Sequence, residues 1–176
     1  MSIKLRSSLI SVGLALVAAT GSLAQTAPAA NPMDTIPEKM PFDVPYGAPI
    51  SLERADAALA AAVAESKTRG WKLICAVVDS GAVLVSFKRM DGAQLGSVEI
   101  ALHKARAAAK FRRETKAFEA GIQSGANYLI TLDDVIGSRG GIPLVESGKI
   151  VGAIGCSGGT GSQDEVASKA GVATVK

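Results

Sequence analysis

Two segments of the chain repeat one pattern of apolar and polar positions. Residues 74–93 and 140–159 each contain a β-branched apolar run, an acidic residue followed by Ser-Gly, and a second apolar run. The acidic turns are Val78-Asp79-Ser80-Gly81 and Val145-Glu146-Ser147-Gly148. Because glycine accepts a positive φ without a steric penalty, each turn can reverse the chain tightly. The pattern predicts two β-hairpins, with strands over residues 71–79, 83–89, 142–146 and 149–156.

Helical patterns surround these hairpins. Residues 52–68 are rich in Ala, Leu and Glu, follow Ser51 as a good N-cap and precede Gly70. A second helix is predicted from Ser97, as its N-cap, to about Arg112. A short helix over 114–123 and a terminal helix over 163–172 follow, and residues 127–131 are expected to begin a strand or turn. This order predicts an α+β domain in which helices pack on the faces of an antiparallel sheet built from the two hairpins.

The predicted helix over residues 97–112 is apolar on two sides. At about 100° per residue, a mostly basic stripe lies apart from both apolar faces. The first face holds Val98, Ala101, Leu102, Ala105 and Ala109, the second Ile100, Ala107 and Phe111, and the stripe Glu99, His103, Arg106, Lys110 and Arg113. Since a helix with two apolar sides usually has two partners, we expect another helix or another subunit to cover this one as well as the sheet.

The first 50 residues predict two segments that precede the domain. Lys4 and Arg6 come before a short uncharged apolar run and small residues at Ser22 and Ala24, which is typical of a secretory signal peptide over 1–24. We therefore expect a periplasmic or secreted protein that begins near Gln25 and has no membrane segment in its mature form, because a spanning helix needs about 20 apolar residues. The segment 25–50 carries six of the seven prolines, which predicts an extended arm before a domain over 51–176. The arm either packs on the domain or on a neighbouring subunit through its aromatic and apolar side chains, or is a solvated tether.

Charge gives no indication of a nucleic-acid partner. Loss of the signal peptide removes two cations and lowers the formal charge from +3 to +1. Only 4% of the residues are aromatic, and none of them alternates with basic residues as a single-strand stacking surface would require. We therefore expect no nucleic-acid partner.

The two cysteines, Cys75 and Cys156, both remain in the mature chain. Each lies inside a predicted strand, which favours buried free thiols, because unpaired cysteine is among the most frequently buried residue types. A disulfide between them is the alternative, since an oxidising compartment permits one.

Candidate chemistry centres on one histidine and one charged turn. No familiar catalytic signature is present, and a single histidine excludes a multi-histidine metal site. His103 could be an axial ligand to a haem iron, with the cations of its stripe pairing with the propionates, or an incidental residue on a solvated helix face. In the turn that contains Arg89 and Asp91, the two side chains could pair with each other, line a ligand pocket or join subunits.

Five motifs in order also carry a family resemblance. They are V-V-D-S-G-A-V-L-V, R-M-D-G-A, K-A-R-A-A-A-K-F over 104–111, G-G-I-P-L and G-K-I-V-G-A-I-G-C-S-G-G. Together they resemble the GlcG/HbpS haem-binding family, which is related to the C-terminal domain of PduO-type cobalamin adenosyltransferases, and the resemblance covers about residues 52–172. It implies a compact α+β domain that assembles into homo-oligomers, and haem as the expected cofactor.

The resemblance adds Thr115, which follows the basic helix, because this region is linked to haem contact in secreted members. The candidate cofactor-binding residues are therefore His103, Arg106, Lys110 and Thr115, with His103 as the metal ligand. The first hypothesis is a secreted oligomeric protein that binds haem or a similar tetrapyrrole between this helix and a neighbouring subunit.

Two other functions stay open, as does the question whether the chain is an enzyme. One is a small-molecule catabolic enzyme in which Arg89 holds a carboxylate and Asp91 moves a proton. Its strand-end pocket would also include Gly140, Gly141 and Cys156. The other is an accessory or assembly module without a ligand.

Overall fold

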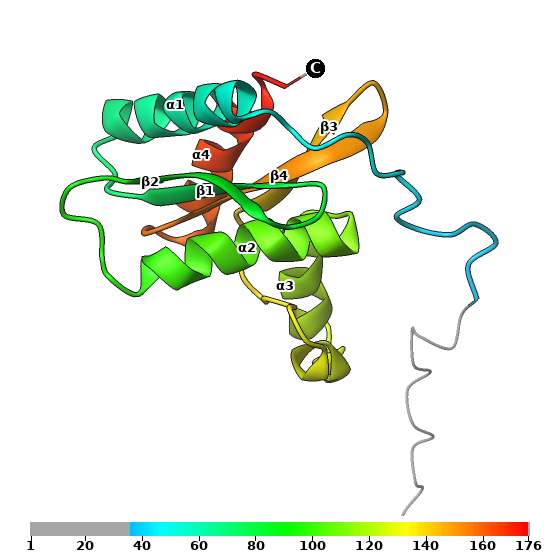
Figure 1. The fold of residues 1–176 in the computed structure, drawn as a ribbon. Coiled ribbons are helices and arrows are strands. Elements are labelled where there is room, and N and C mark those ends of the chain that lie inside the picture. The colour runs from blue at the N-terminus through cyan, green and yellow to red at the C-terminus, as the bar shows by residue number, and fades with distance from the viewer. Residues whose placement is uncertain (1–35, 176) are drawn as a thin grey trace, which may run out of the picture. The chain divides into compact units, whose positions relative to one another are not determined.

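A four-stranded antiparallel sheet forms the centre of the fold, and its strands are the two predicted hairpins (Figure 1). β1 (Ile74–Asp79) pairs with β2 (Leu84–Arg89), and β3 (Gly141–Glu146) pairs with β4 (Lys149–Ser157). β1 and β4 join the hairpins at the centre, so the strand order is β2-β1-β4-β3. The predicted α+β class is confirmed. This computed structural model describes residues 36–175, so the predicted signal peptide and residues 25–35 of the arm lie outside the described part.

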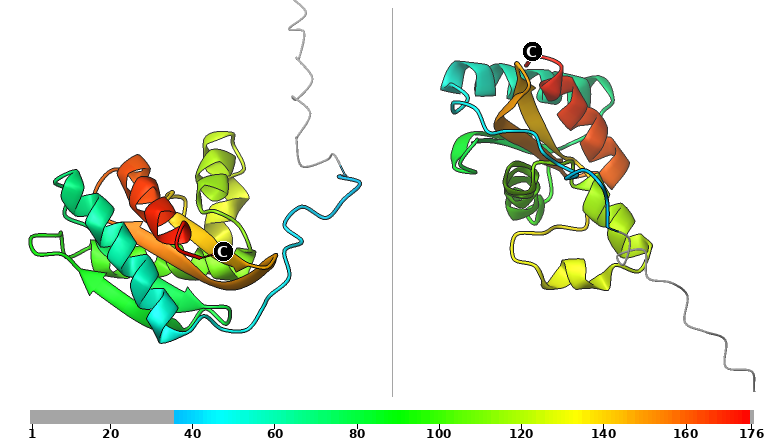
Figure 2. Two further views of the ribbon diagram at one scale, coloured as in Figure 1. Left: turned by 90° about the horizontal axis from the view of Figure 1, so that it is seen from above. Right: turned by 90° about the vertical axis from the view of Figure 1, so that its right-hand side faces the viewer.

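Helices cover both faces of the sheet. α1 (Leu52–Thr68) and α4 (Gly161–Val172) lie against each other on one face, and α2 (Ser97–Phe111) crosses the other over β1, β4 and β3 (Figure 2). The Ser51 hydroxyl caps α1 by accepting a hydrogen bond from the backbone N–H of Arg54. Thr160 and Gln163 form a capping box that starts α4 two residues before the predicted position.

The start of α2 differs from the prediction that Ser97 is its N-cap. Ser97 is the first helical residue, and Gly96 occupies the cap position without a side-chain bond. Ser97 is buried, and its hydroxyl accepts a hydrogen bond from the Gln94 side chain at 2.8 Å. Ser97 therefore connects the first turn of α2 to the loop that precedes it. The sequence pattern around Ser97 does not distinguish this contact from helix capping.

The space between α2 and the sheet is filled by small side chains. The apolar cluster between α2 and the sheet consists largely of alanines. The apolar cluster on the other face of the sheet, under α1 and α4, contains larger residues such as Leu59, Leu144 and Ile154. A Cβ at Gly155 of β4 would lie 2.3 Å from the backbone oxygen of Ala101 on α2. Glycine at this position therefore lets the helix backbone approach the strand backbone closely.

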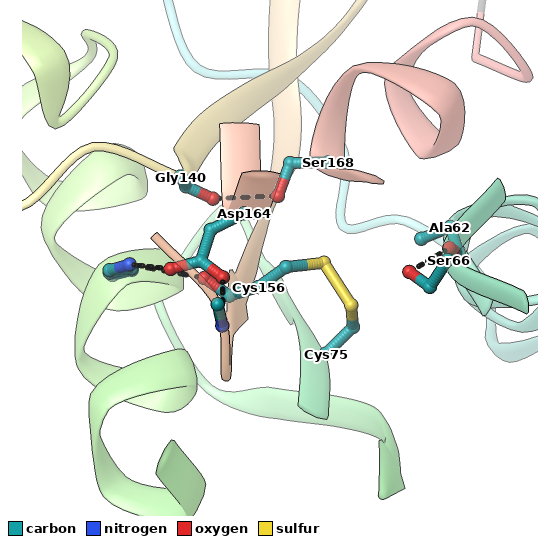
Figure 3. The surroundings of a disulfide bond; sticks show 9 residues. Ala62, Ser66, Cys75, Gly140, Cys156, Asp164 and Ser168 are labelled. Atoms are coloured by element: carbon teal, nitrogen blue, oxygen red, sulfur yellow. Dashed lines mark hydrogen bonds and ion pairs between the residues drawn. A yellow bond between two sulfur atoms is a disulfide. The ribbon is translucent and has the colours of Figure 1, made fainter. Parts of the chain in front are cut away.

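The prediction that the two cysteines are free thiols is wrong. Cys75 and Cys156 lie opposite each other on β1 and β4 and form a buried disulfide (Figure 3). Directly opposed residues of antiparallel strands have Cα atoms close enough for a disulfide. The pairing depends on the register of strands that are separated by 81 residues, and the local pattern does not contain that register.

Part of the arm packs on the domain through Tyr46. The backbone around Tyr46 forms a parallel bridge with Ile150 at the start of β4, with hydrogen bonds between Ile150 and both Pro45 and Gly47. The Tyr46 hydroxyl lies 2.9 Å from the carbonyl oxygen of Lys110 at the last turn of α2. These contacts hold residues 45–47 against β4 and the end of α2.

The expected second partner of α2 is present at its C-terminal end. α3 (Lys116–Gln123) places Phe118 edge-on against Phe111, with ring centroids 5.2 Å apart. The segment expected to begin a strand or turn is instead a 3-10 helix, η2 (Asn127–Thr131). Ile100, nearer the start of α2, stays 37% exposed, so the second apolar side is only partly covered within this chain. Among residues 36–175, no helix has the length and apolar character needed to cross a membrane.

Candidate functional site

The basic stripe of α2 lines a hollow of about 270 Å³. Glu99, Leu102, His103 and Arg106 are spaced by three, four and seven residues and therefore share one helix face. Asp134, from the segment after η2, also lines the hollow. The structure thus brings together two of the predicted cofactor-binding residues, His103 and Arg106.

Lys110 and Asp134 form an ion pair beside this hollow. The Lys110 ammonium donates to a carboxylate oxygen of Asp134 at 2.5 Å. This hydrogen bond holds the pKa of Asp134 below its ordinary value. Arg106 makes no hydrogen bond or ion pair among the residues that the structure describes, and its charge helps to lower the pKa of the Asp134 carboxyl in the same hollow.

His103 carries a nitrogen without a partner. Its Nε2 atom is buried and makes no hydrogen bond within the described structure, although the residue as a whole is partly exposed. A buried polar atom without a partner costs roughly 1–3 kcal/mol. That cost is removed if the ring turns and gives this nitrogen to a ligand.

Thr115 and Arg113 lie away from the hollow. The Thr115 hydroxyl is fully buried and accepts a hydrogen bond from the backbone N–H of Gly141 at 3.0 Å. Arg113 lies over the ring of Phe42, 3.3 Å from its centroid, and burial lowers the pKa of Arg113. Both side chains fasten the end of α2 to neighbouring segments and present no group to the hollow.

The pocket expected for an enzyme does not form as one unit. Arg89 and Asp91 line a separate pocket of about 500 Å³ with residues of α1 and β2. Gly140, Gly141 and Cys156 are buried and do not line it, and Cys156 is bonded to Cys75. The structure therefore does not bring these three residues together with Arg89 and Asp91, because their burial keeps them out of the solvent-facing lining.

Sequence reasoning missed a buried ion pair between α2 and α4. Lys104 and Asp164 have side chains that are 0% and 3% exposed, and their charged atoms lie 2.7 Å apart. The Lys104 ammonium also donates to the carbonyl oxygen of Cys156, and Asp164 accepts from the backbone N–H of Gly159. The available signal was the position of Lys104 among the alanines that face the sheet.

A family model described as haem degrading protein HbpS-like matches residues 50–173. The chain belongs to the HbpS-like family. The predicted resemblance to GlcG and HbpS is therefore confirmed, and the arm up to Pro49 precedes the matched region.

Members and structural neighbours of the HbpS-like family give the scale of this similarity. Protein GlcG of Escherichia coli K12 is 37% identical over 108 residues, which are 61% of this chain and 81% of GlcG. A double mutant of HbpS from Streptomyces reticuli has a TM-score of 0.69 and 28% identity, over 85% of this chain and 99% of that chain. A PduOC–haem complex has a TM-score of 0.67 over 73% of this chain and 96% of that chain, and at 24% identity it shows the shared fold alone.

Proposed function

We propose that this protein binds haem, or a closely similar tetrapyrrole, at the α2 hollow. The observation that carries the proposal is the buried, unpartnered Nε2 of His103 beside the unpaired guanidinium of Arg106. The choice of ligand is supported by the family to which the chain belongs, whose model is described as haem degrading protein HbpS-like. The fold has also been observed with haem, in the PduOC complex.

The residues of the hollow fit haem in their chemistry. Bound haem supplies an iron that accepts an imidazole nitrogen and two propionates that pair with cations. His103 would supply the nitrogen after its ring turns outward, and Arg106 would pair with a propionate. Lys110 would hold the Asp134 carboxylate in place beside the haem, because its ammonium already donates a hydrogen bond to that carboxylate.

The size of the hollow supports a site completed by a second copy of the chain. Its 270 Å³ lies below the roughly 300–1,000 Å³ that is typical of pockets for drug-sized ligands. Ile100 on the same helix remains exposed, which leaves an apolar position for a neighbour. We therefore propose a homo-oligomer in which haem lies between α2 of one subunit and the surface of the next.

A periplasmic or secreted location is the remaining part of the proposal. The Cys75–Cys156 disulfide supports it, because disulfides persist in oxidising compartments and are rare in the cytosol. The positively charged start, apolar run and small residues of the first 24 positions point the same way.

Titration with haemin, followed by Soret absorption, tests the binding site. The unaltered protein should give a saturable Soret shift, and His103→Gln should change the band and weaken binding by about tenfold, since the iron loses its nitrogen ligand. Arg106→Ala should weaken binding by about fivefold, the upper end for an exposed ion pair. Lys149→Ala, which removes an exposed cation at the turn of the second hairpin, is the matched control.

Two outcomes would overturn the proposal. One is a protein that gives no saturable shift with haemin. The other is a titration in which the His103 and Arg106 variants match the Lys149 control, because haem would then bind at a different surface.

A further inference from the structure

The pocket that contains Arg89 and Asp91 lies on the opposite face of the sheet from the proposed haem site. It measures about 500 Å³ and lies between the C-terminal half of α1 and the end of β2. Lys88 is opposite Cys75, whose side chain belongs to the cluster under α1 and α4. This pocket is therefore separated from α2 by the sheet.

The lining of this pocket combines a small apolar floor with a cationic rim. Val63 and Met90 are partly buried and supply the apolar atoms. Lys67 from the last turn of α1 and Lys88 from β2 supply two exposed cations, and Arg89, which also belongs to the lining, follows Lys88 at the end of β2.

The cations of the rim have few anions to balance them. Within the described residues, Lys67, Lys88 and Arg89 make no ion pair or side-chain hydrogen bond. Asp91 is the single carboxylate that lines the pocket. The acid of the adjacent helical turn, Glu65, is already bonded to Arg69 at 2.6 Å.

A fourth cation lies beside the turn that carries Asp91. A Cβ placed on Gly92 would meet the side chain of Lys72, with its ammonium nitrogen 3.2 Å away. The Lys72 side chain therefore runs along this turn and adds to the positive charge near the rim. Mutual repulsion among these cations is relieved by an anion that enters the pocket.

We propose that this pocket binds a small organic dicarboxylate. Lys67 comes from α1 and Lys88 from β2, so two separated carboxylates can each reach a positive group while a short carbon chain covers Val63 and Met90. Lys88 is the main contact on β2, because its side chain lies on the α1 side of the sheet with Cys75, whereas Arg89, opposite Ile74, leaves the strand on the other side. This inference does not depend on haem binding, which concerns the other face of the sheet.

Isothermal titration calorimetry with four probes on the full chain tests the ligand class. Succinate has two carboxylates on a four-carbon skeleton, butyrate has one, butanediol has none, and inorganic phosphate has charge without carbon. Succinate should bind at least about fivefold more tightly than butyrate, and butanediol should give no saturable heat. Added salt should weaken the binding of succinate, because exposed charges are screened.

Variants test the location. Lys88→Ala and Lys67→Ala should each weaken succinate binding by up to about fivefold, whereas Lys149→Ala and His103→Gln should leave it unchanged. The proposal is overturned if succinate does not saturate, if butyrate or phosphate binds as tightly, or if the pocket variants match the Lys149 control. A loss of succinate binding in His103→Gln would also overturn it, by placing the anion at the α2 hollow.

Discussion

Replacing Lys104 with methionine removes one charge from a buried ion pair and leaves the other charge without its partner. Methionine nearly preserves the length and volume of the lysine stem, so the packing against the alanines of α2 and the sheet should survive. Asp164 would keep the backbone N–H of Gly159 as a donor but would lose the ammonium at 2.7 Å. The carbonyl oxygen of Cys156 would lose a hydrogen bond as well.

The expected loss is large relative to the stability of a single domain. Removing one member of a buried pair costs about 3–5 kcal/mol, because the remaining charge stays buried without compensation. The total free energy of unfolding of a domain is roughly 5–15 kcal/mol. Lys104→Met should therefore lose a fifth or more of the stability of the fold, and α4 should separate from α2 at lower denaturant concentration.

Urea unfolding, followed by the fluorescence of Trp71, the only tryptophan of the chain, measures this loss. The double variant Lys104→Met with Asp164→Leu should recover most of it, since replacing both charges by apolar groups is often neutral or stabilising. Lys149→Met, on an exposed lysine, should stay within about 0.5 kcal/mol of the unaltered protein. A loss below about 1 kcal/mol in Lys104→Met, or a double variant no better than the single one, would refute the reasoning.

Two further predictions concern the disulfide and the response to acid. The double variant Cys75→Ala with Cys156→Ala should lower the free energy of unfolding by about 4.5 kcal/mol, the chain-entropy value for a bridge that spans 81 residues. Chemical denaturation under identical redox conditions measures it, and an unchanged midpoint would contradict it. Hydrogen bonds from Arg139 and Lys169 lower the pKa values of Glu119 and Glu165 below 4.5. The stability that these two carboxylates contribute is therefore complete above pH 4.5 and is lost as pH falls through the lowered pKa values. Glutamine variants at both positions should flatten the plot of unfolding free energy against pH below pH 4.5. An equally steep plot would show that other groups cause the loss of stability in acid.

The elements of the fold could be predicted because their signals are local. A Ser-Gly turn between two β-branched runs specifies a hairpin, and Ser51 before a helical run specifies a helix start. The pairing of β1 with β4 could not be predicted in this way, because it depends on contacts between residues 81 positions apart. The disulfide depends on the same register and was missed for the same reason.

The candidate site could also be predicted only where its contacts are local. His103 and Arg106 could be placed together from helical spacing alone, because a helix fixes which positions share a face. Asp134 could not be added, since it reaches the hollow from the loop after η2. Lys104 was missed because lysine ordinarily faces solvent, and its burial depends on a carboxylate 60 residues further along the chain.

Amide hydrogen exchange with and without haemin tests most directly whether haem binds on α2. If His103 and Arg106 form the site, protection should increase over residues 99–110 and around Asp134 and should be lost in His103→Gln. Unchanged exchange in these segments, or protection confined to residues 63–67 and 88–91, would contradict haem binding at α2.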